Sequence, residues 1–272
     1  MENYSVLMSV YYKEKPKYLR EAMMSIYNQT LPTNDFVLVC DGPLNDELDS
    51  VIEEMQKLFG NILNVYRLKK NSGLGNALNA GLKKCKNELV GRMDSDDICR
   101  VDRFEKQVEL FNFYSDTSVI SAAINEFNIS PNCSVGKRIV PSDNNKIIKY
   151  SKRRNPFNHP AVMFKKSHVN SVGGYSEEFH LFEDYHLWIR MLMRGYKGYN
   201  SPEIFVDMRT PTDIYKRRGG WKYAKNLLRF HFWSFRAGWE TGVDFFIFAF
   251  LHYLICILPN SLRKLIYTEV LR

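Results

Sequence analysis

The sequence is short of cysteine, and the few it has are not arranged for the sites that cysteine usually builds. Five cysteines are spread over 272 residues, an odd number, and no two form a C-x-x-C pair. We therefore expect neither a disulfide framework nor a structural zinc site, and a reducing cytosol is the simpler setting. The N-terminus also lacks the basic start and cleavage site of a signal peptide, so none is expected.

A long membrane-spanning apolar run is also missing. The best candidate, Val243 to Leu258, has about 16 residues with His252 inside it, whereas a spanning helix needs about 20. Basic residues flank the run. We expect an in-plane amphipathic or re-entrant helix that contacts the membrane surface. A helix packed in the core or at a dimer interface is the alternative.

No strong excess of one charge is present either. The net charge of +8 is mild for this length, and residues 210–272 carry ten Lys and Arg against four Asp and Glu. Because most of the excess lies in the tail, an anionic membrane surface is the expected partner. A nucleic-acid-binding module would need its basic footprint on the core, so no nucleic-acid partner is expected.

Apolar strands and amphipathic helices alternate through the first half of the chain. Each of the first three strands is followed by a segment with apolar residues at spacings of three and four. This order predicts an α/β fold with a mostly parallel sheet and helices on both faces. The four strands are expected at 4–11, 36–40, 64–68 and 88–93.

The second half is less regular. Pro156 and Pro160 fall within a short apolar segment, which predicts an edge or irregular strand at 155–165. A further strand is expected at 118–127, and helices are expected at 182–194 and 221–233.

Polar and aromatic side chains follow three of the predicted strands, where parallel sheets bind ligands. They are Tyr11 and Tyr12, then Asp41, then Asp94-Ser95-Asp96-Asp97. Three carboxylates within four residues repel one another unless a cation lies between them. Magnesium or manganese suits such hard oxygen ligands and would bridge phosphate oxygens. A solvated turn or a helix cap is the alternative.

Five motifs, in order, resemble the family 2 glycosyltransferases, the inverting group with the GT-A fold. The resemblance covers roughly residues 4 to 220. The motifs are the opening strand Ser5–Tyr12, the acidic turn Asp41-Gly42, the N-x-G-x-x-x-A-x-N-x-G helix start Asn71–Gly81, the D-x-D of Asp94–Asp97, and the E-D pair Glu183-Asp184.

This resemblance implies a role for each motif. Val10, Tyr11, Tyr12 and Asp41 would bind the nucleotide base, with Asp41 accepting from uracil N3–H. Asp94 would lie near the ribose, Asp96 would hold Mn²⁺ or Mg²⁺, and Asp184 would be the catalytic base. Asn71, Gly73 and Ser95 complete the expected nucleotide-sugar site.

Other candidate residues have plainer alternatives. The N–H groups at Gly73 suit an anion, or the glycines only form a turn. Glu183 and Asp184 could simply favour the dipole of their helix. His159 could face the acceptor, the phosphates or the metal, or be structural. Arg217 and Arg218 could neutralise the leaving diphosphate, or form a solvated cluster.

We expect an inverting transferase that moves a UDP-hexose or UDP-N-acetylhexosamine sugar onto a saccharide acceptor. By resemblance, the acceptor is a lipid-linked bacterial surface polysaccharide and the enzyme is peripheral on the cytoplasmic face of the membrane. A nucleotidyltransferase would need a G-x-G-T-R-like loop that is absent. A non-catalytic nucleotide-sugar-binding protein is disfavoured by the intact acids. The expected division is a GT-A domain at 1–220, with nucleotide-binding (1–100) and acceptor (101–220) halves, and a helical extension at 221–272.

Overall fold

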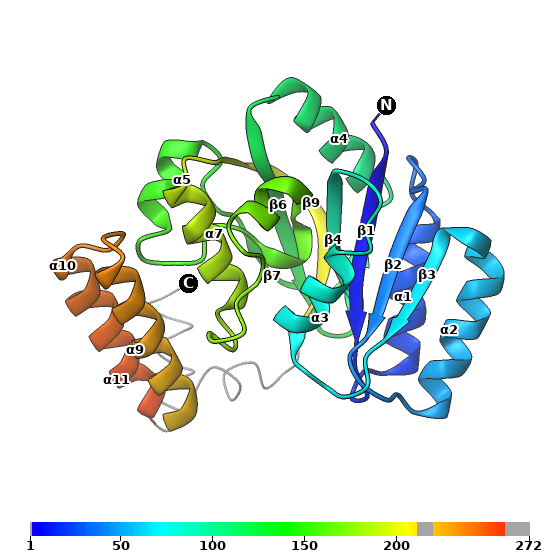
Figure 1. Cartoon of the computed structure of the whole chain (residues 1–272), viewed down its shortest axis with the longest axis horizontal. Helices are drawn as coiled ribbons and strands as arrows, with labels where there is room; N and C mark the ends of the chain where they lie inside the picture. The colour runs from blue at the N-terminus through cyan, green and yellow to red at the C-terminus, as the bar shows by residue number, and fades with distance from the viewer. Residues whose placement is uncertain (1, 211–219, 259–272) are drawn as a thin grey trace.

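A twisted mixed sheet with helices on both faces forms the body of the protein in the computed structural model (Figure 1). The structure describes residues 2–210 and 220–258. The strands are β1 Tyr4–Val10, β2 Asp35–Cys40, β3 Leu63–Arg67, β4 Leu89–Asp94, β5 Ile98–Cys99, β6 Thr117–Phe127, β7 Ser134–Arg138, β8 Met163–Lys165 and β9 Lys197–Arg209. They follow the order β3-β2-β1-β4-β8-β6-β9-β5, and β7 pairs with β6.

The helices fall between these strands and after them. They are α1 Pro16–Tyr27, α2 Asp46–Phe59, α3 Leu74–Leu82, α4 Arg103–Phe113, α5 Asn144–Tyr150, α6 Lys166–Ser171, α7 Glu183–Met193, α9 Trp221–Arg236, α10 Gly242–Asp244 and α11 Leu251–Ile257. Short 3₁₀ turns are η1 Gly60–Ile62 and η2 His159–Ala161, and η3 Phe245–Phe250 is π-helical.

The predicted first half is confirmed. The first four strands pair in parallel, and their residues alternate between two apolar layers. Met8 and Leu38 pack toward α1, α2 and α4, whereas Leu7 and Val37 pack toward α3 and α7. The strand arrows of β1 to β3 point to the lower edge in Figure 1, so the loops after them meet at that edge.

The α3 helix lies unusually close to the sheet because its last turn contains glycine. A Cβ on Gly81 would meet Leu7 Cδ1 at 2.4 Å and Val39 Cγ2 at 2.7 Å. Such contacts are too short for any side chain, so glycine is required there. The glycine that closes the Asn71–Gly81 motif therefore fixes the depth at which α3 packs, and with it the place where the helix begins.

The prediction of an edge or irregular strand at 155–165 is wrong in its position. The segment contains η2 followed by β8, and β8 lies inside the sheet between β4 and β6, antiparallel to both. Pro156 and Pro160 both precede Met163, where the ladder starts, so neither ring removes a sheet hydrogen bond. The remaining strands beyond β8 pair in both directions.

The C-terminal helices form a hairpin at one end of the molecule (Figure 1). The α9 helix pairs with α11 and η3, and its Phe230 ring stacks on Phe182 with centroids 5.2 Å apart. Phe230 also contacts Tyr185, which follows Asp184 in α7. Over the described residues, none of the helices combines the length and the apolar character needed to cross a bilayer.

Candidate active site

The acidic loop lies where β4 ends, at the carboxyl edge of the sheet. Asp94 is the last residue of β4 and pairs in register with Ser9 of β1. Ser95 donates a hydrogen bond from Oγ to Glu14 Oε2 over 2.8 Å. Burial and the charges of Asp94 and Glu14 raise the pKa of Asp96 to about 7. Negative charge is therefore concentrated at this edge, as the sequence predicted.

Asp97, which the sequence left unassigned, has a structural environment. Its side chain is buried, and Oδ1 accepts a hydrogen bond from the backbone N–H of Arg209 over 2.7 Å. The Arg209 guanidinium also donates to the carbonyl of Asp96 and stacks on Tyr18. Asp97 thus ties the end of β9 to the acidic loop, while the neighbouring Asp96 stays partly exposed.

The acidic loop fits a divalent cation that takes one or two ligands from the protein and the rest from bound phosphates and water. Asp96 is crowded by two other carboxylates, so a cation beside it would relieve their repulsion. No cluster of three His, Cys, Asp or Glu side chains that could hold a metal occurs in the described part of the chain. Magnesium ions in phosphate sites commonly use one or two carboxylates, with phosphates and water completing the shell. The residues present match that pattern.

Asp41 organises the loop that leads into α3. Its two carboxylate oxygens accept hydrogen bonds from the backbone N–H groups of Ser72 (2.7 Å) and Gly73 (3.0 Å). Asn71 donates from its side chain to the Asp41 carbonyl over 3.2 Å. A Cβ on Gly42 would lie 2.5 Å from Asn71 N, so this turn requires glycine. The anion at the start of α3 is thus the protein's own carboxylate.

The exit of β1 presents two aromatic rings beside this loop. Val10 is buried, and its carbonyl accepts from the Asp41 N–H over 2.8 Å. Tyr11 and Tyr12 are 40% and 51% exposed, and their rings meet edge to face with centroids 5.8 Å apart. The structure therefore brings the first-strand exit and Asp41 together and leaves both tyrosine rings accessible to a ligand.

Asp184 lies in the first turn of α7. Its Oδ2 accepts a hydrogen bond of 2.6 Å from Nδ2 of Asn155. Burial raises the pKa of the Asp184 carboxyl, while hydrogen bonds from the Tyr185 backbone and Asn155 and the charges of Arg92 and Arg138 act against the rise. The carboxyl is therefore a stronger base than an exposed aspartate, which suits proton abstraction.

Glu183 lies against the start of α3. A Cβ on Gly75 would be 3.5 Å from the Glu183 Cβ and 2.9 Å from the carbonyl oxygen of Ser176. Burial and the charge of Asp184 raise the pKa of Glu183 to about 7, and Oε2 has no hydrogen-bond partner within the described residues. The backbone just before the pair is strained, because Leu181 has a φ of 72°. The pair and the Gly73–Gly75 turn thus share one edge.

His159 lies next to the E-D pair. Its Nδ1 is 4.0 Å from Asp184 Oδ2, and its Nε2 is 3.1 Å from the Tyr175 hydroxyl. Burial and the charge of Arg92 hold the pKa of His159 well below its usual range. The ring is therefore neutral, and it lies between Asp184 and the Tyr175 hydroxyl, with which Nε2 shares a hydrogen bond. Arg217 and Arg218, the other predicted contacts, lie outside the described residues.

Three polar residues around the site were not predicted from the sequence, Arg92, Asn155 and Tyr175, and a fourth, Asn79, was predicted only as part of the Asn71–Gly81 motif. Asn79 exchanges two hydrogen bonds of 2.8 Å with the backbone of Tyr175. This fixes the loop that carries Tyr175 on α3. The alternation of side chains along a strand could have pointed to Arg92. It stands two residues before Asp94 in the same strand, so both side chains project from the same face of the sheet.

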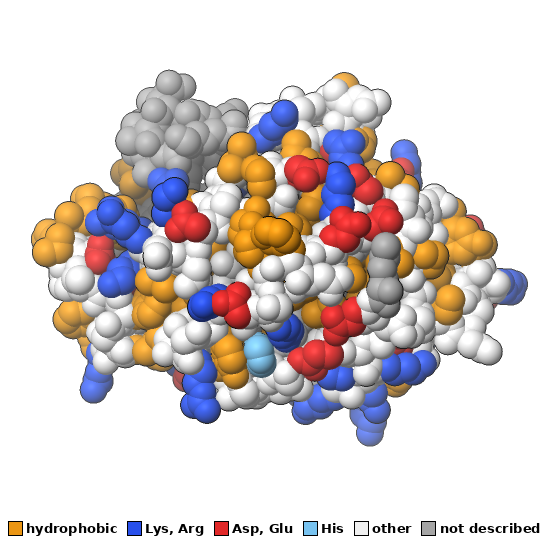
Figure 2. All heavy atoms as spheres, turned by 90° about the horizontal axis from the view of Figure 1, so that it is seen from above, with side chains coloured by type: hydrophobic (Ala, Val, Ile, Leu, Met, Phe, Trp, Pro, Cys, Tyr) orange, Lys and Arg blue, Asp and Glu red, His pale blue; other side chains and the backbone are white. Residues whose placement is uncertain are grey.

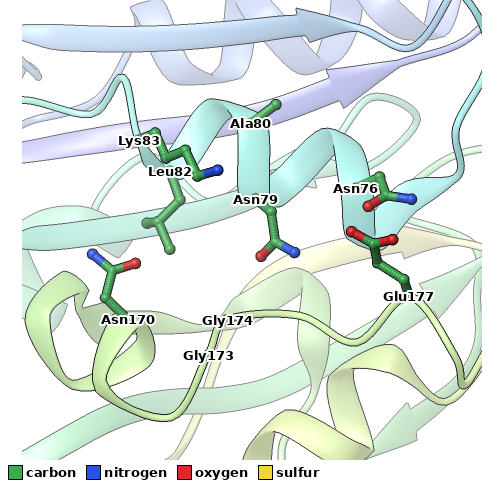
Figure 3. Close-up of a pocket in the computed structure, with 9 residues that line it drawn as sticks. All are labelled: Asn76, Asn79, Ala80, Leu82, Lys83, Asn170, Gly173, Gly174 and Glu177. Atoms are coloured by element: carbon green, nitrogen blue, oxygen red, sulfur yellow. The ribbon is translucent and has the colours of Figure 1, made fainter.

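One hollow beside this loop is lined by residues of α3 and of the segment that carries Tyr175 (Figure 3). It measures about 430 Å³ and opens between α3 and the segment 170–177. Its polar lining includes the amides of Asn76, Asn79 and Asn170 and the charged side chains of Lys83 and Glu177. None of the predicted site residues lines it, so it is separate from the carboxylate edge.

Comparison with known proteins gives one consistent family. The sequence model of glycosyl transferase family 2 matches residues 5–173. The chain is 41% identical over 269 residues to the UDP-Gal:alpha-D-GlcNAc-diphosphoundecaprenol beta-1,3-galactosyltransferase of Escherichia coli, covering 99% of this chain and 96% of that one. It is 36% identical to the amylovoran biosynthesis glycosyltransferase AmsE of Erwinia amylovora, over 98% of each chain.

Solved structures agree on the fold. The mannosyltransferase PcManGT of Pyrobaculum calidifontis, solved with GDP-Man and Mn²⁺, superimposes with a TM-score of 0.68 at 18% identity, over 96% of this chain and 72% of that one. A fragment of S. aureus TarS in complex with UDP gives 0.61 at 20% identity, over 83% of this chain and 65% of that one. This chain therefore spans slightly less than two thirds of the TarS fragment. At these identities the likeness supports the GT-A fold.

Proposed function

The chain belongs to glycosyl transferase family 2, and from that premise we propose that it transfers a hexose or N-acetylhexosamine from a UDP-sugar, with inversion, to a lipid-linked saccharide. The Escherichia coli relative, named for UDP-Gal and a GlcNAc-diphosphoundecaprenol acceptor, supports both substrate classes. The relative from Erwinia amylovora supports a role in bacterial polysaccharide synthesis.

One observation carries this proposal: the fold brings two sets of carboxylates to the same edge from opposite halves of the chain. Asp94 ends β4 and Asp96 follows two residues later, while Asp184 lies in the first turn of α7. The charge of Asp94 acts on Tyr175, which lies beside His159 and Asp184. A donor site and a base on one edge are what a single displacement needs.

Asp184 is the base in this scheme. It takes the proton of the acceptor hydroxyl as that oxygen attacks the anomeric carbon and the bond to the UDP diphosphate breaks. Attack opposite the leaving group inverts the anomeric centre. Asn155 holds the carboxylate by its bond to Oδ2, and the neutral His159 excludes water on one side without competing for the proton.

Asp96 would hold Mn²⁺ or Mg²⁺, which when bound neutralises the charge that develops on the leaving diphosphate. The residues around it are assigned to the nucleotide. Asp94 and Ser95 would contact the ribose, and the exposed rings of Tyr11 and Tyr12 would stack on the base. Each Asp41 oxygen already accepts one bond and retains capacity for a second, so uracil N3–H remains a proposed partner. Val10, Asn71 and Gly73 would shape this pocket.

Nucleotide binding provides the direct test of the donor site. We expect a saturating concentration of UDP with Mn²⁺ to raise the melting temperature by roughly 5–10 °C. GDP, ADP and CDP should stabilise the protein less, and EDTA should remove most of the UDP effect. The measurement is thermal unfolding followed by fluorescence. If none of the four nucleotides stabilises the protein with either metal, the proposed donor site is wrong.

The C-terminal hairpin provides a surface for the membrane. Exposed apolar side chains recur every three or four residues through α10, η3 and α11, and we call them the C-terminal patch: Val243, Phe246, Ile247, Phe250, Leu251 and Leu254. Apolar side chains gather at this end of the molecule, with Lys and Arg beside them (Figure 2). Arg153 lies over the Phe248 ring and Arg236 over Phe232. An apolar stripe with basic neighbours suits an anionic bilayer surface.

We therefore propose a peripheral enzyme on the cytoplasmic face of the cell membrane. The five cysteines are all free, which suits a reducing compartment. Membrane docking would also place the site near a lipid-linked acceptor, because the hairpin packs on the helix that carries Asp184. The proposed division into a catalytic domain at 1–220 and a membrane-associated extension at 221–272 follows from these roles.

Replacing Phe246 and Phe250 with Asp should release the protein from anionic vesicles. Both rings are more than 40% exposed, so the folded state loses little packing while the patch loses two apolar anchors. We expect at least a tenfold weaker partition onto phosphatidylglycerol vesicles, measured by co-sedimentation, because burying a charge in place of a ring costs more than about 1.4 kcal/mol.

Phe113→Asp is the matched control, since Phe113 is 78% exposed on α4, outside the hairpin. It should sediment with vesicles as the unaltered protein does. Unchanged sedimentation of the double variant, with a shift from dimer to monomer in ultracentrifugation, would instead assign the patch to a second copy of the chain.

A further inference from the structure

Arg92 places a positive charge inside the sheet, directly beneath the candidate site. It lies on β4, which is flanked by β1 and β8, and its side chain is 1% exposed. Its guanidinium forms a bidentate ion pair with Asp94, with Nη1 2.5 Å from Oδ2 and Nη2 bonded to Oδ1. Its Nε has no hydrogen-bond partner within the described part of the chain.

Folding stability alone gives little reason for such a residue. A buried guanidinium loses its hydration, and one half-exposed carboxylate returns only part of that free energy. Apolar replacements of buried ion pairs are often neutral or stabilising. The neighbouring positions Val90 and Met93 are apolar and fully buried, so an apolar side chain would suit the strand. Stability therefore does not explain the charge at position 92, and we look for a role in function.

The charge of Arg92 reaches both halves of the site. Val90, Arg92 and Asp94 project to the sheet face that α3 and α7 cover, since Val90 packs in that apolar layer. On this face the positive charge lowers the pKa of Asp184 and of His159. The ionisable groups that face or influence Asp184 come from several elements: Arg92 on β4, Arg138 on β7, His159 on η2, Tyr175 in the preceding loop, and Glu183 and Tyr185 on α7.

We propose that Arg92 is a positioning residue shared by the donor and acceptor halves: it orients Asp94 through its two hydrogen bonds, and its charge compensates that of Asp184. Arg138 is the other cation that acts on Asp184, and it lies on the peripheral strand β7, half-buried. Arg92 bonds Asp94, a residue of the donor half. This inference rests on the proposed function, because it assigns Asp94 to the nucleotide and Asp184 to the base.

Two substitutions separate the two parts of the role. Arg92→Met removes the charge, so the carboxylate form of Asp184 becomes harder to maintain. The acidic limb of the pH profile of kcat/KM should move upward by about one pH unit, because activity requires the ionised base and is lost as pH falls through its pKa. Arg92→Lys keeps the charge but loses the two parallel hydrogen bonds of the guanidinium to Asp94. The acidic limb of the pH profile should therefore stay in place, while KM for the UDP-sugar rises several-fold.

Arg103→Met is the matched control. Arg103 is equally buried and donates to the carbonyls of Arg92 and Val162, but from the opposite face of the sheet. Its replacement should lower the melting temperature and leave the acidic limb unchanged. Melting curves establish whether each variant is folded. If Arg92→Met does not fold, the KM of Arg92→Lys for the UDP-sugar is the measurement that tests the inference.

Three outcomes overturn the inference: an acidic limb in Arg92→Met that coincides with that of the unaltered protein, an unchanged donor KM in Arg92→Lys, or the same pH shift in Arg103→Met. Failure of the proposed function looks different, because the unaltered protein would then neither bind UDP nor transfer sugar.

Discussion

Asp184→Asn is expected to lower kcat for sugar transfer by about 100- to 10,000-fold while the affinity for UDP changes by no more than about twofold. The carboxamide matches the carboxylate in shape but cannot take a proton from the acceptor hydroxyl. Asn155 can still meet the amide oxygen at Oδ2, so the first turn of α7 should keep its structure. UDP release during transfer gives kcat, and calorimetric titration with UDP gives the affinity.

Asp143→Asn is the matched control for this change. Asp143 is exposed and caps α5 by accepting a hydrogen bond from the Lys146 N–H, and asparagine caps helices equally well. Its kcat should equal that of the unaltered protein. Normal turnover by Asp184→Asn would assign proton removal elsewhere, and Glu183, buried beside it with a pKa of about 7, is the first alternative to test.

The surroundings of Asp184 explain how a partly buried carboxyl can serve as a base. Burial alone would favour the protonated form, which cannot accept a proton. Hydrogen bonds from the Tyr185 backbone and Asn155, with the charges of Arg92 and Arg138, act against this rise in the pKa and favour the ionised form. The pKa of Asp184 is thus set by burial, which raises it, and by groups from several elements of the fold, which lower it.

The sequence sufficed to locate the acidic loop and the parallel half of the sheet, because both depend on local patterns. An apolar strand at 88–93 followed by Asp94–Asp97 fixes the loop at a strand end, and β4 ends there in the structure. The amphipathic spacings that precede this strand likewise predicted α1, α2 and α3. Each of these elements is determined by the order of apolar and polar residues within a short stretch of the chain.

The remaining site residues depend on tertiary contacts that no local pattern encodes. Asn155 is 29 residues from Asp184 in sequence, and Tyr175 is 96 residues from Asn79, yet each pair is hydrogen-bonded. The interior position of β8 escaped for the same reason. Prolines near a short strand usually mark an edge, and only the sheet order reveals that they precede the ladder.

Replacing Asp96 with Asn should abolish the extra thermal stabilisation that Mn²⁺ gives to the UDP complex. Asp96 is partly exposed, and burial together with repulsion from Asp94 and Glu14 raises its pKa to about 7. A cation is the group that would offset this repulsion, and an amide oxygen binds it far less strongly than a carboxylate does. We expect kcat/KM to fall about 100-fold or more, measured by transfer across a Mn²⁺ titration.

Asp97→Asn tests whether the effect belongs to Asp96 alone. Asp97 is buried, and its Oδ1 accepts the Arg209 N–H, a bond that a carboxamide oxygen can also accept. Its replacement should alter the melting temperature but keep the response to Mn²⁺, because Asp97 faces the end of β9. If the two variants exchange these behaviours, the metal is held by Asp97 and the partly exposed Asp96 has another role. Asp96 is partly exposed and Asp97 is bonded to a distant strand, so we expect the Mn²⁺ response to be lost when the first is replaced and kept when the second is replaced.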